Sequence, residues 1–144
     1  MSSISDFIAG YEKFSPSVYL DPVGIPTIGY GETNVSDMRQ RMSEPAAREL
    51  LNYKINKIGK DIAKDFPTLS EAQKNAIVSL VYNVGRGNWK RSKAYKALKA
   101  NKVSEFVSEA FSPEKGFVKA GGNVLPGLVK RRQDEMNMFL KGKL

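Results

Sequence analysis

The chain has 144 residues, with 23 Lys and Arg against 15 Asp and Glu for a net charge of +8, and it contains neither histidine nor cysteine. These absences exclude Ser-His-Asp and Cys-His catalysis, disulfides, zinc fingers and iron–sulfur clusters, so any chemistry must use carboxylates, hydroxyls, Lys, Arg, Tyr or backbone groups. The length and composition predict one soluble domain that folds alone and is attracted to an anionic partner such as nucleic acid, a membrane surface or acidic envelope polymers.

The N-terminal segment predicts a helix that carries a candidate acid. Residues Met1–Asp6 lack the basic and apolar regions of a secretory signal, so we expect the product to start in the cytoplasm. Apolar residues then recur at helical spacing until Ser15-Pro16, which ends the helix. Glu12 borders this apolar stripe, and we expect it to be partly buried. The stripe consists of Ile4, Phe7, Ile8 and Tyr11.

The next segment predicts a small β-hairpin. Val18–Leu20 and Ile25–Gly31 have strand character, and the turn-forming run Asp21–Gly24 lies between them. Pro26 is expected on a sheet edge, where a missing amide proton is tolerated.

The remainder of the chain predicts helices. A long helix begins near Ser43-Glu44-Pro45 and ends before Pro67, and Ser70–Gln73 has the spacing of a capping box. The capping box leads into an apolar run expected to form a buried central helix, with Gly85 and Gly87 at its C-terminal end. Shorter helices are expected over about 92–100, 103–110 and 128–140.

Two further features of this region have structural interpretations. Trp89, the only tryptophan, is expected to be a partly buried anchor. The basic run Lys130-Arg131-Arg132 is expected to form a solvated helix face.

Two carboxylates stand out as a candidate catalytic pair. Glu12 can be shielded by apolar neighbours and kept protonated as a general acid, whereas Asp21 opens a wetter turn and should stay ionised. The Thr27 hydroxyl could hold a water, and Gly29 and Gly31 would let backbone approach a bulky ligand. Taken one at a time, each residue also has an ordinary structural explanation as a solvated helix residue, a turn former, a strand residue or a bulge.

In combination, these residues resemble a known family. The segments Tyr11–Phe14 and Tyr19–Thr33 are similar to the catalytic region of the bacteriophage-type lysozymes, glycoside hydrolase family 24. That family has Glu, Asp and Thr in this order with eight and then five intervening residues, and Glu12, Asp21 and Thr27 reproduce both spacings. The similarity includes the motif Thr-Ile-Gly-Tyr-Gly, continues through residues 69–87, and returns at residues 127–132 and 135.

Two positions depart from the family pattern. Lys13 stands where the family usually has Gly after the catalytic Glu, and it places a cation beside the proposed acid. Glu32 stands where a His commonly follows the second glycine of the motif, and it adds a third carboxylate nearby. Neither departure removes Glu12, Asp21 or Thr27.

The resemblance implies an α+β fold, mostly α, with two lobes in a single lysozyme-like domain spanning residues 1–144. A small lobe of about 15–45 and a linking helix of about 44–65 would be followed by a helical lobe of about 66–144 that packs with the N-terminal helix.

The same resemblance implies a lysozyme, a glycoside hydrolase that cleaves the β-1,4 bond between N-acetylmuramic acid and N-acetylglucosamine in peptidoglycan and so lyses the host cell. Glu12 would protonate the departing oxygen, and Asp21 with Thr27 would stabilise the transition state and position water. The expected substrate-binding residues are Gly29, Tyr30, Gly31, Glu32 and Asn83. Simple packing would equally explain Tyr30, and a helix C-cap would equally explain Asn83.

The expected partners and location follow from the same interpretation as a lysozyme. No metal or other cofactor is expected, and the protein is expected to be a monomer that acts on peptidoglycan and the anionic cell envelope. A host-cytoplasmic protein without a signal would need release by a membrane-permeabilising partner such as a holin, while a virion-associated enzyme is a second option. Two alternative functions are a basic nucleic-acid-binding protein and a catalytically inactive wall-binding phage component.

Overall fold

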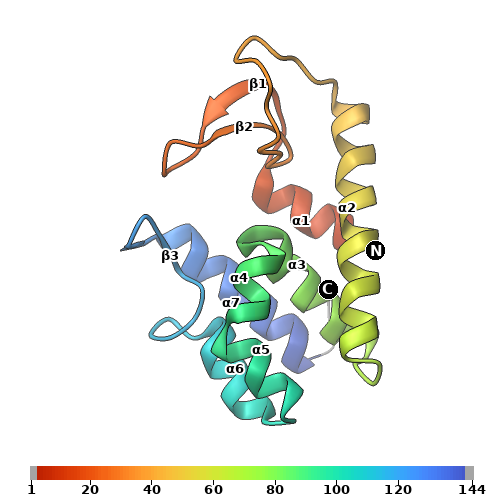
Figure 1. Cartoon of the computed structure of the whole chain (residues 1–144), viewed down its shortest axis with the longest axis vertical. Coiled ribbons are helices and arrows are strands. Elements are labelled where there is room, and N and C mark those ends of the chain that lie inside the picture. The colour runs from red at the N-terminus through yellow and green to blue at the C-terminus, as the bar shows by residue number, and fades with distance from the viewer. Residues whose placement is uncertain (1–2, 142–144) are drawn as a thin grey trace. The chain divides into compact units, whose positions relative to one another are not determined.

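A computed structural model describes residues 3–141, so residues 1–2 and 142–144 lie outside the described part, including the first two residues of the segment used to predict the absence of a signal. The chain divides into two compact units, residues 1–55 and 56–144, and the division falls inside one long helix. In chain order the elements are α1 (Ile4–Glu12), β1 (Ser15–Leu20), β2 (Pro26–Gly29), α2 (Glu44–Asp65), α3 (Glu71–Val84), α4 (Arg86–Arg91), α5 (Lys93–Lys99), α6 (Val103–Phe111), β3 (Lys119–Ala120), β4 (Asn123–Val124) and α7 (Pro126–Lys141) (Figure 1).

Helices with two short antiparallel hairpins confirm the predicted α+β, mostly α class. Among residues 3–141, none of the helices is both long and apolar enough to span a membrane.

In the first unit, α1 contains the predicted apolar stripe but ends at Glu12, before Ser15-Pro16, which lie in β1. The Ser3 side chain caps the helix by accepting a hydrogen bond of 3.1 Å from the Asp6 amide, and Ile8 is fully buried. Glu12 is the last helical residue, and the chain then enters β1. The acid is thereby fixed at the junction between the helix and the hairpin.

The predicted hairpin is also present. β1 and β2 pair antiparallel, with Tyr19 opposite Thr27 and Leu20 opposite Pro26, and the register shifts between Ser15 and Tyr19. Residues directly opposite one another in an antiparallel pair project their side chains to the same face. Tyr19 and Thr27 therefore share one face of the hairpin.

In the second unit, α3 forms the buried centre that the sequence predicts. Ser70 and Gln73 make both hydrogen bonds of the capping box, and Ile77 and Leu80 are fully buried. Gly85, at φ +91°, caps the helix with its amide bonded to the Val81 carbonyl. Gly87 instead lies inside α4, which sequence reasoning missed together with the β3–β4 hairpin.

Trp89 is an anchor, and its burial is more complete than expected. The side chain is 1% exposed and makes edge-on contacts with Phe66, Tyr95 and Phe106. Edge-to-face packing of aromatic rings stabilises such a cluster beyond the area it buries.

The basic run on α7 is not a solvated face, so that prediction is wrong for two of its three residues. Lys130 is exposed, but Arg131 and Arg132 are 4% and 0% exposed because they surround the fully buried Glu135 carboxylate, which also accepts a hydrogen bond from Ser79. Burial raises the pKa of Glu135, and the two guanidinium groups oppose that shift. A buried charged group requires such partners, so these residues belong to the core of the second unit.

Candidate active site

The proposed acid lies against a loop in which the backbone conformation of position 31 favours glycine. A Cβ added at Gly31 would lie 2.5 Å from Oε1 of Glu12, and Gly31 also has a φ of +80°. The backbone conformation therefore favours glycine, and a larger residue would also displace the Glu12 carboxylate. Glu12 itself is half-buried, as the sequence predicts. The sequence predicted that the backbone at Gly31 approaches a ligand. In the structure this backbone approaches the carboxylate of Glu12, the proposed acid.

The residue after the acid adopts a conformation that favours glycine. Lys13 caps α1 with φ +59° and ψ 142°, and its amide donates to the Ala9 carbonyl. A side chain at positive φ is strained, whereas glycine is not. This gives a physical reason for the glycine usual at this position in the lysozyme pattern. The exposed Lys13 side chain is accommodated at the cost of backbone strain.

Asp21 organises the turn of the hairpin. Its Oδ1 accepts hydrogen bonds of 2.9 Å from the Val23 amide and 2.8 Å from the Ile25 amide. Its own amide donates to the Ile25 carbonyl, and its carbonyl accepts from Gly24. The structural role expected of an aspartate in a turn is therefore real, and it engages one carboxylate oxygen.

Thr27 is joined to the same turn. The residue is 3% exposed, and its hydroxyl donates a hydrogen bond of 2.8 Å to the Ile25 carbonyl, the same oxygen that receives the Asp21 amide. Because a hydroxyl has one proton, Thr27 is left with lone pairs to offer a further partner. The Ile25 backbone thus connects Asp21 and Thr27 directly.

The charges of Glu12 and Asp21 act on the same phenol. Burial raises the pKa of Tyr19 most strongly, and the negative charges of Glu12 and Asp21 both raise it further. Coulombic effects of this kind fall with distance. Both carboxylates therefore act on the phenol of Tyr19, which shares a face of the hairpin with Thr27.

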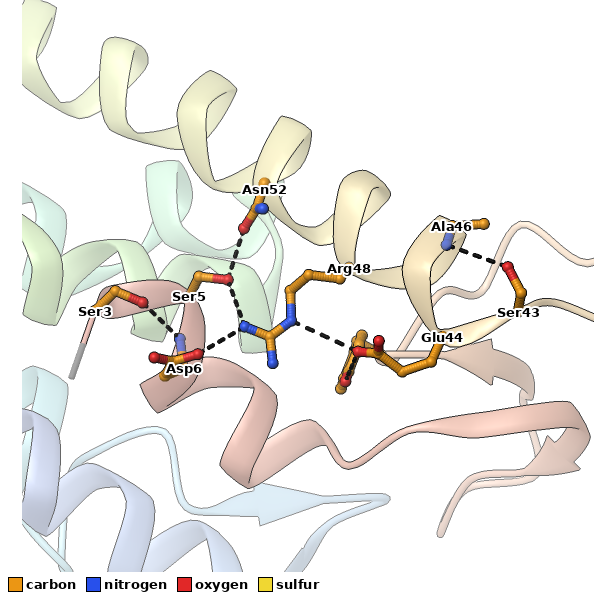
Figure 2. A network of polar contacts seen from close by, with 9 residues as sticks. Ser3, Ser5, Asp6, Ser43, Glu44, Ala46, Arg48 and Asn52 are labelled. Atoms are coloured by element: carbon orange, nitrogen blue, oxygen red, sulfur yellow. Dashed lines mark hydrogen bonds and ion pairs between the residues drawn. The ribbon is translucent and has the colours of Figure 1, made fainter.

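A polar network holds α1 against the first half of α2 (Figure 2). An Arg48 nitrogen, Nη1, donates to Asp6 at 2.7 Å and to Ser5 at 3.2 Å, and Ser5 in turn donates to Asn52 at 2.6 Å. Arg48 Nε also lies 3.9 Å from a Glu44 carboxylate oxygen. These contacts fix the helix at whose end Glu12 lies.

Tyr30 extends this network to the hairpin. Its hydroxyl donates to Glu44 at 2.6 Å, its ring lies 5.7 Å from that of Phe14, and the Arg48 guanidinium lies 5.4 Å from the ring centre. Only 8% of Tyr30 is exposed. These contacts favour packing, one of the two roles expected for this residue.

Glu32 fastens the loop to α2. It accepts a hydrogen bond of 2.7 Å from the Lys54 ammonium and one of 3.2 Å from the Asn34 amide. Burial raises the pKa of Glu32, but these bonds outweigh it and hold the pKa below its ordinary value. The third carboxylate therefore stays ionised and paired.

The two remaining predicted residues have different surroundings. Gly29, at φ +66°, is approached by Met42, whose sulfur would lie 2.8 Å from an added Cβ. Asn83 is exposed near the C-terminal end of α3, in the second unit. Substrate binding by either residue stays a prediction.

Comparison with known proteins decides the family. The sequence profile described as phage lysozyme matches residues 9–135, a span that contains Glu12, Asp21 and Thr27. The chain belongs to the phage lysozyme family. The predicted resemblance is thereby confirmed.

Individual relatives are endolysins, and one solved structure shares the fold. The endolysin of Bacillus phage B103 is 35% identical over 81% of this chain, which spans only 44% of that protein. The endolysin of Acyrthosiphon pisum secondary endosymbiont phage 1 is 29% identical over 92% of this chain and 91% of its own length. The active form of the P1 phage endolysin has the same fold, with a TM-score of 0.77, 20% identity, and coverage of 99% of this chain and 85% of its own.

Sequence reasoning did not single out Tyr19 or the Ile25 backbone, which the structure places next to the predicted residues Thr27 and Asp21. The turn offered a signal, because a hairpin centred on Val23 must place position 19 opposite position 27. The hydrogen bonds that Ile25 makes to Asp21 and Thr27 had no such signal, since Ile25 contributes only backbone atoms to them.

Replacing Lys13 with the residue usual in phage lysozymes should stabilise the chain. We expect Lys13→Gly to increase the free energy of unfolding by about 1 kcal/mol, because relief of strain exceeds the added entropy of the unfolded chain. Thermal or urea unfolding measures this change. Lys13→Ala is the control: it removes the same charge but keeps Cβ, so it should give no such gain. An equal gain in both variants would assign the effect to charge.

Proposed function

We propose that this chain is a muramidase of the endolysin type that hydrolyses the β-1,4 bond between N-acetylmuramic acid and N-acetylglucosamine in peptidoglycan and thereby lyses the host cell. The observation that carries the proposal is the family match over residues 9–135, which spans an acid, a second carboxylate and a hydroxyl held in one compact unit. The endolysins among its relatives support the same activity.

Glu12 is the proposed general acid. Its place at the end of α1, half-buried against Gly31, keeps one side of the carboxyl away from water. In its protonated form it would donate its proton to the glycosidic oxygen as the bond to the leaving sugar breaks. The Arg48 network would support this step by holding α1 in place.

Asp21 and Thr27 are proposed to act on the other reactant, water. The amides of Val23 and Ile25 hold Oδ1 of Asp21, which leaves Oδ2 to face positive charge on the sugar or a water proton. Because the Thr27 proton is committed to the Ile25 carbonyl, Thr27 would accept a hydrogen bond from that water. The two acceptors together would orient a water lone pair for attack.

Loss of the acid should abolish activity without unfolding the chain. We expect Glu12→Gln to release no reducing muramic acid ends from purified peptidoglycan, because an amide cannot protonate the leaving oxygen. Mass analysis of the digest measures this and distinguishes a muramidase from a transglycosylase or an amidase. The unfolding midpoint should stay near that of the original chain. Normal lysis by this variant would refute the proposed mechanism.

The structural and chemical roles of Asp21 can be separated. Asn can accept the same two amide hydrogen bonds at Oδ1 but carries no charge, so we expect Asp21→Asn to keep the unfolding midpoint and lose about 10²–10³-fold in turnover. Asp21→Ala, which also loses the bonds of the turn, should lose stability as well. Kinetics and thermal unfolding of both variants measure the difference. Full turnover in a folded Asp21→Asn variant would show that the mechanism does not need the negative charge of Asp21.

The proposal includes attraction of the second unit to the anionic envelope. Residues 56–144 carry 18 Lys and Arg against 8 Asp and Glu, whereas residues 1–55 carry 5 against 7. On α5, Lys93, Lys96 and Lys99 are exposed, while the intervening Ala94 and Ala97 are buried. One face of α5 therefore carries a row of cations. The excess of positive charge lies in residues 56–144 and not in residues 1–55, which contain the proposed catalytic residues.

Charge reversal on this row should weaken wall binding in a salt-dependent way. We expect the double variant Lys93→Glu, Lys96→Glu to bind purified cell walls about tenfold more weakly than the original chain at low salt. At about 0.1 M salt, where the Debye length is about 10 Å, the loss of binding should be smaller. Cosedimentation with walls measures this. The control Arg39→Glu with Arg41→Glu makes the same change in the first unit and should have a smaller effect. Equal effects of the two double variants would show that the attraction depends on net charge and not on the α5 row. Tight DNA binding without wall hydrolysis would favour the nucleic-acid-binding alternative.

A further inference from the structure

The two tyrosines of the hairpin region have opposite surroundings. Tyr30 is 8% exposed, and its hydroxyl is bonded to Glu44. Tyr19 is 39% exposed, and within residues 3–141 its hydroxyl makes no hydrogen bond. Buried phenols generally find a partner inside the protein, whereas an exposed phenol can bind a ligand. The aromatic residue available to a ligand is therefore Tyr19.

The position of Tyr19 places it beside the proposed chemistry. Its register partner is Thr27, so the two side chains share a face of the hairpin, and Asp21 follows two residues later along the chain. The bulge between Ser15 and Tyr19 lies before this pair, and the register from Tyr19 to Leu20 is regular. A ring at this point borders the residue proposed to hold the water.

The electrostatic surroundings determine what the phenol can do. Burial and then the charges of Glu12 and Asp21 raise the pKa of Tyr19, so the hydroxyl keeps its proton at neutral pH. A protonated phenol here is a hydrogen-bond donor beside Asp21 and Thr27, which the proposed mechanism uses as acceptors. Sugar hydroxyl and acetamido oxygens are natural acceptors for such a donor.

We propose that Tyr19 contacts the sugar bound at the cleavage position, with its hydroxyl donating a hydrogen bond to a saccharide oxygen and its ring lying along an apolar face of the sugar. This proposal rests on the proposed muramidase function and deepens it. Tyr19, and not Tyr30, is then the aromatic residue that binds substrate. The contact forms when substrate binds, before any bond is broken, so it contributes to binding more than to turnover.

Kinetics test this assignment on soluble peptidoglycan fragments. Tyr19→Phe removes only the hydroxyl and should raise KM about three- to tenfold, as expected for one lost neutral hydrogen bond, with kcat within about twofold of the original. Tyr19→Ala also removes the ring and should reduce kcat/KM about tenfold further. The matched control is Tyr53→Phe, which alters an exposed tyrosine on α2 and should change neither constant. An unchanged KM in Tyr19→Phe overturns the proposal.

A binding measurement separates this proposal from the proposed function. In the Glu12→Gln background, a ring-labelled tyrosine resonance, assigned by its loss in Tyr19→Phe, should shift on titration with a soluble trisaccharide of N-acetylglucosamine. If Glu12→Gln is inactive but the Tyr19 resonance does not move while other resonances do, only the Tyr19 assignment fails. If Glu12→Gln remains lytic, the proposed mechanism fails, and the resonance shift then tests sugar binding by itself.

Discussion

The geometry of the site depends on the close approach of the Gly31 backbone to the Glu12 carboxylate. A larger residue at position 31 would have a strained backbone at φ +80° and would displace the Glu12 carboxylate, because its Cβ would lie 2.5 Å from Oε1. Reciprocal backbone hydrogen bonds of 2.8 Å between Ile28 and Glu32 close the loop, and the Glu32 side chain binds Lys54 on α2. The loop is therefore held from both sides, and it limits where the carboxylate of Glu12 can lie.

A second constraint lies entirely in the backbone. The amide of Ile25 binds Asp21, and its carbonyl receives both the Asp21 amide and the Thr27 hydroxyl. The amide and the carbonyl of Ile25 belong to the two planar peptide groups that flank its Cα, so the backbone of one residue positions two functional side chains. The Ile25 side chain itself is 44% exposed. The position can therefore vary in residue type while the arrangement of Asp21 and Thr27 is retained.

The sequence predicted the elements whose positions depend on interactions between residues close in the chain. Capping residues, hydrophobic period and turn residues placed α1, the hairpin, α2 and α3 close to their observed bounds. It could not show that Arg131 and Arg132 are buried, because their exposure depends on Glu135 and on Ser79 from another helix. Nor could it distinguish Tyr30 from Tyr19, since the hydroxyl of Tyr30 is bound by Glu44, fourteen residues away. These failures all concern contacts between elements.

The distribution of charge separates two requirements that the proposed activity places on the chain. Attraction to an anionic wall acts over about a Debye length and needs only an excess of cations, which residues 56–144 supply. Proton donation by Glu12 needs a site whose nearby cations do not hold the acid in its ionised form. In residues 1–55, Arg48 is paired with Asp6 and Lys54 with Glu32, so these two cations are engaged by carboxylates outside the proposed catalytic pair. Attraction and catalysis can therefore change independently, since each depends on a different set of charges.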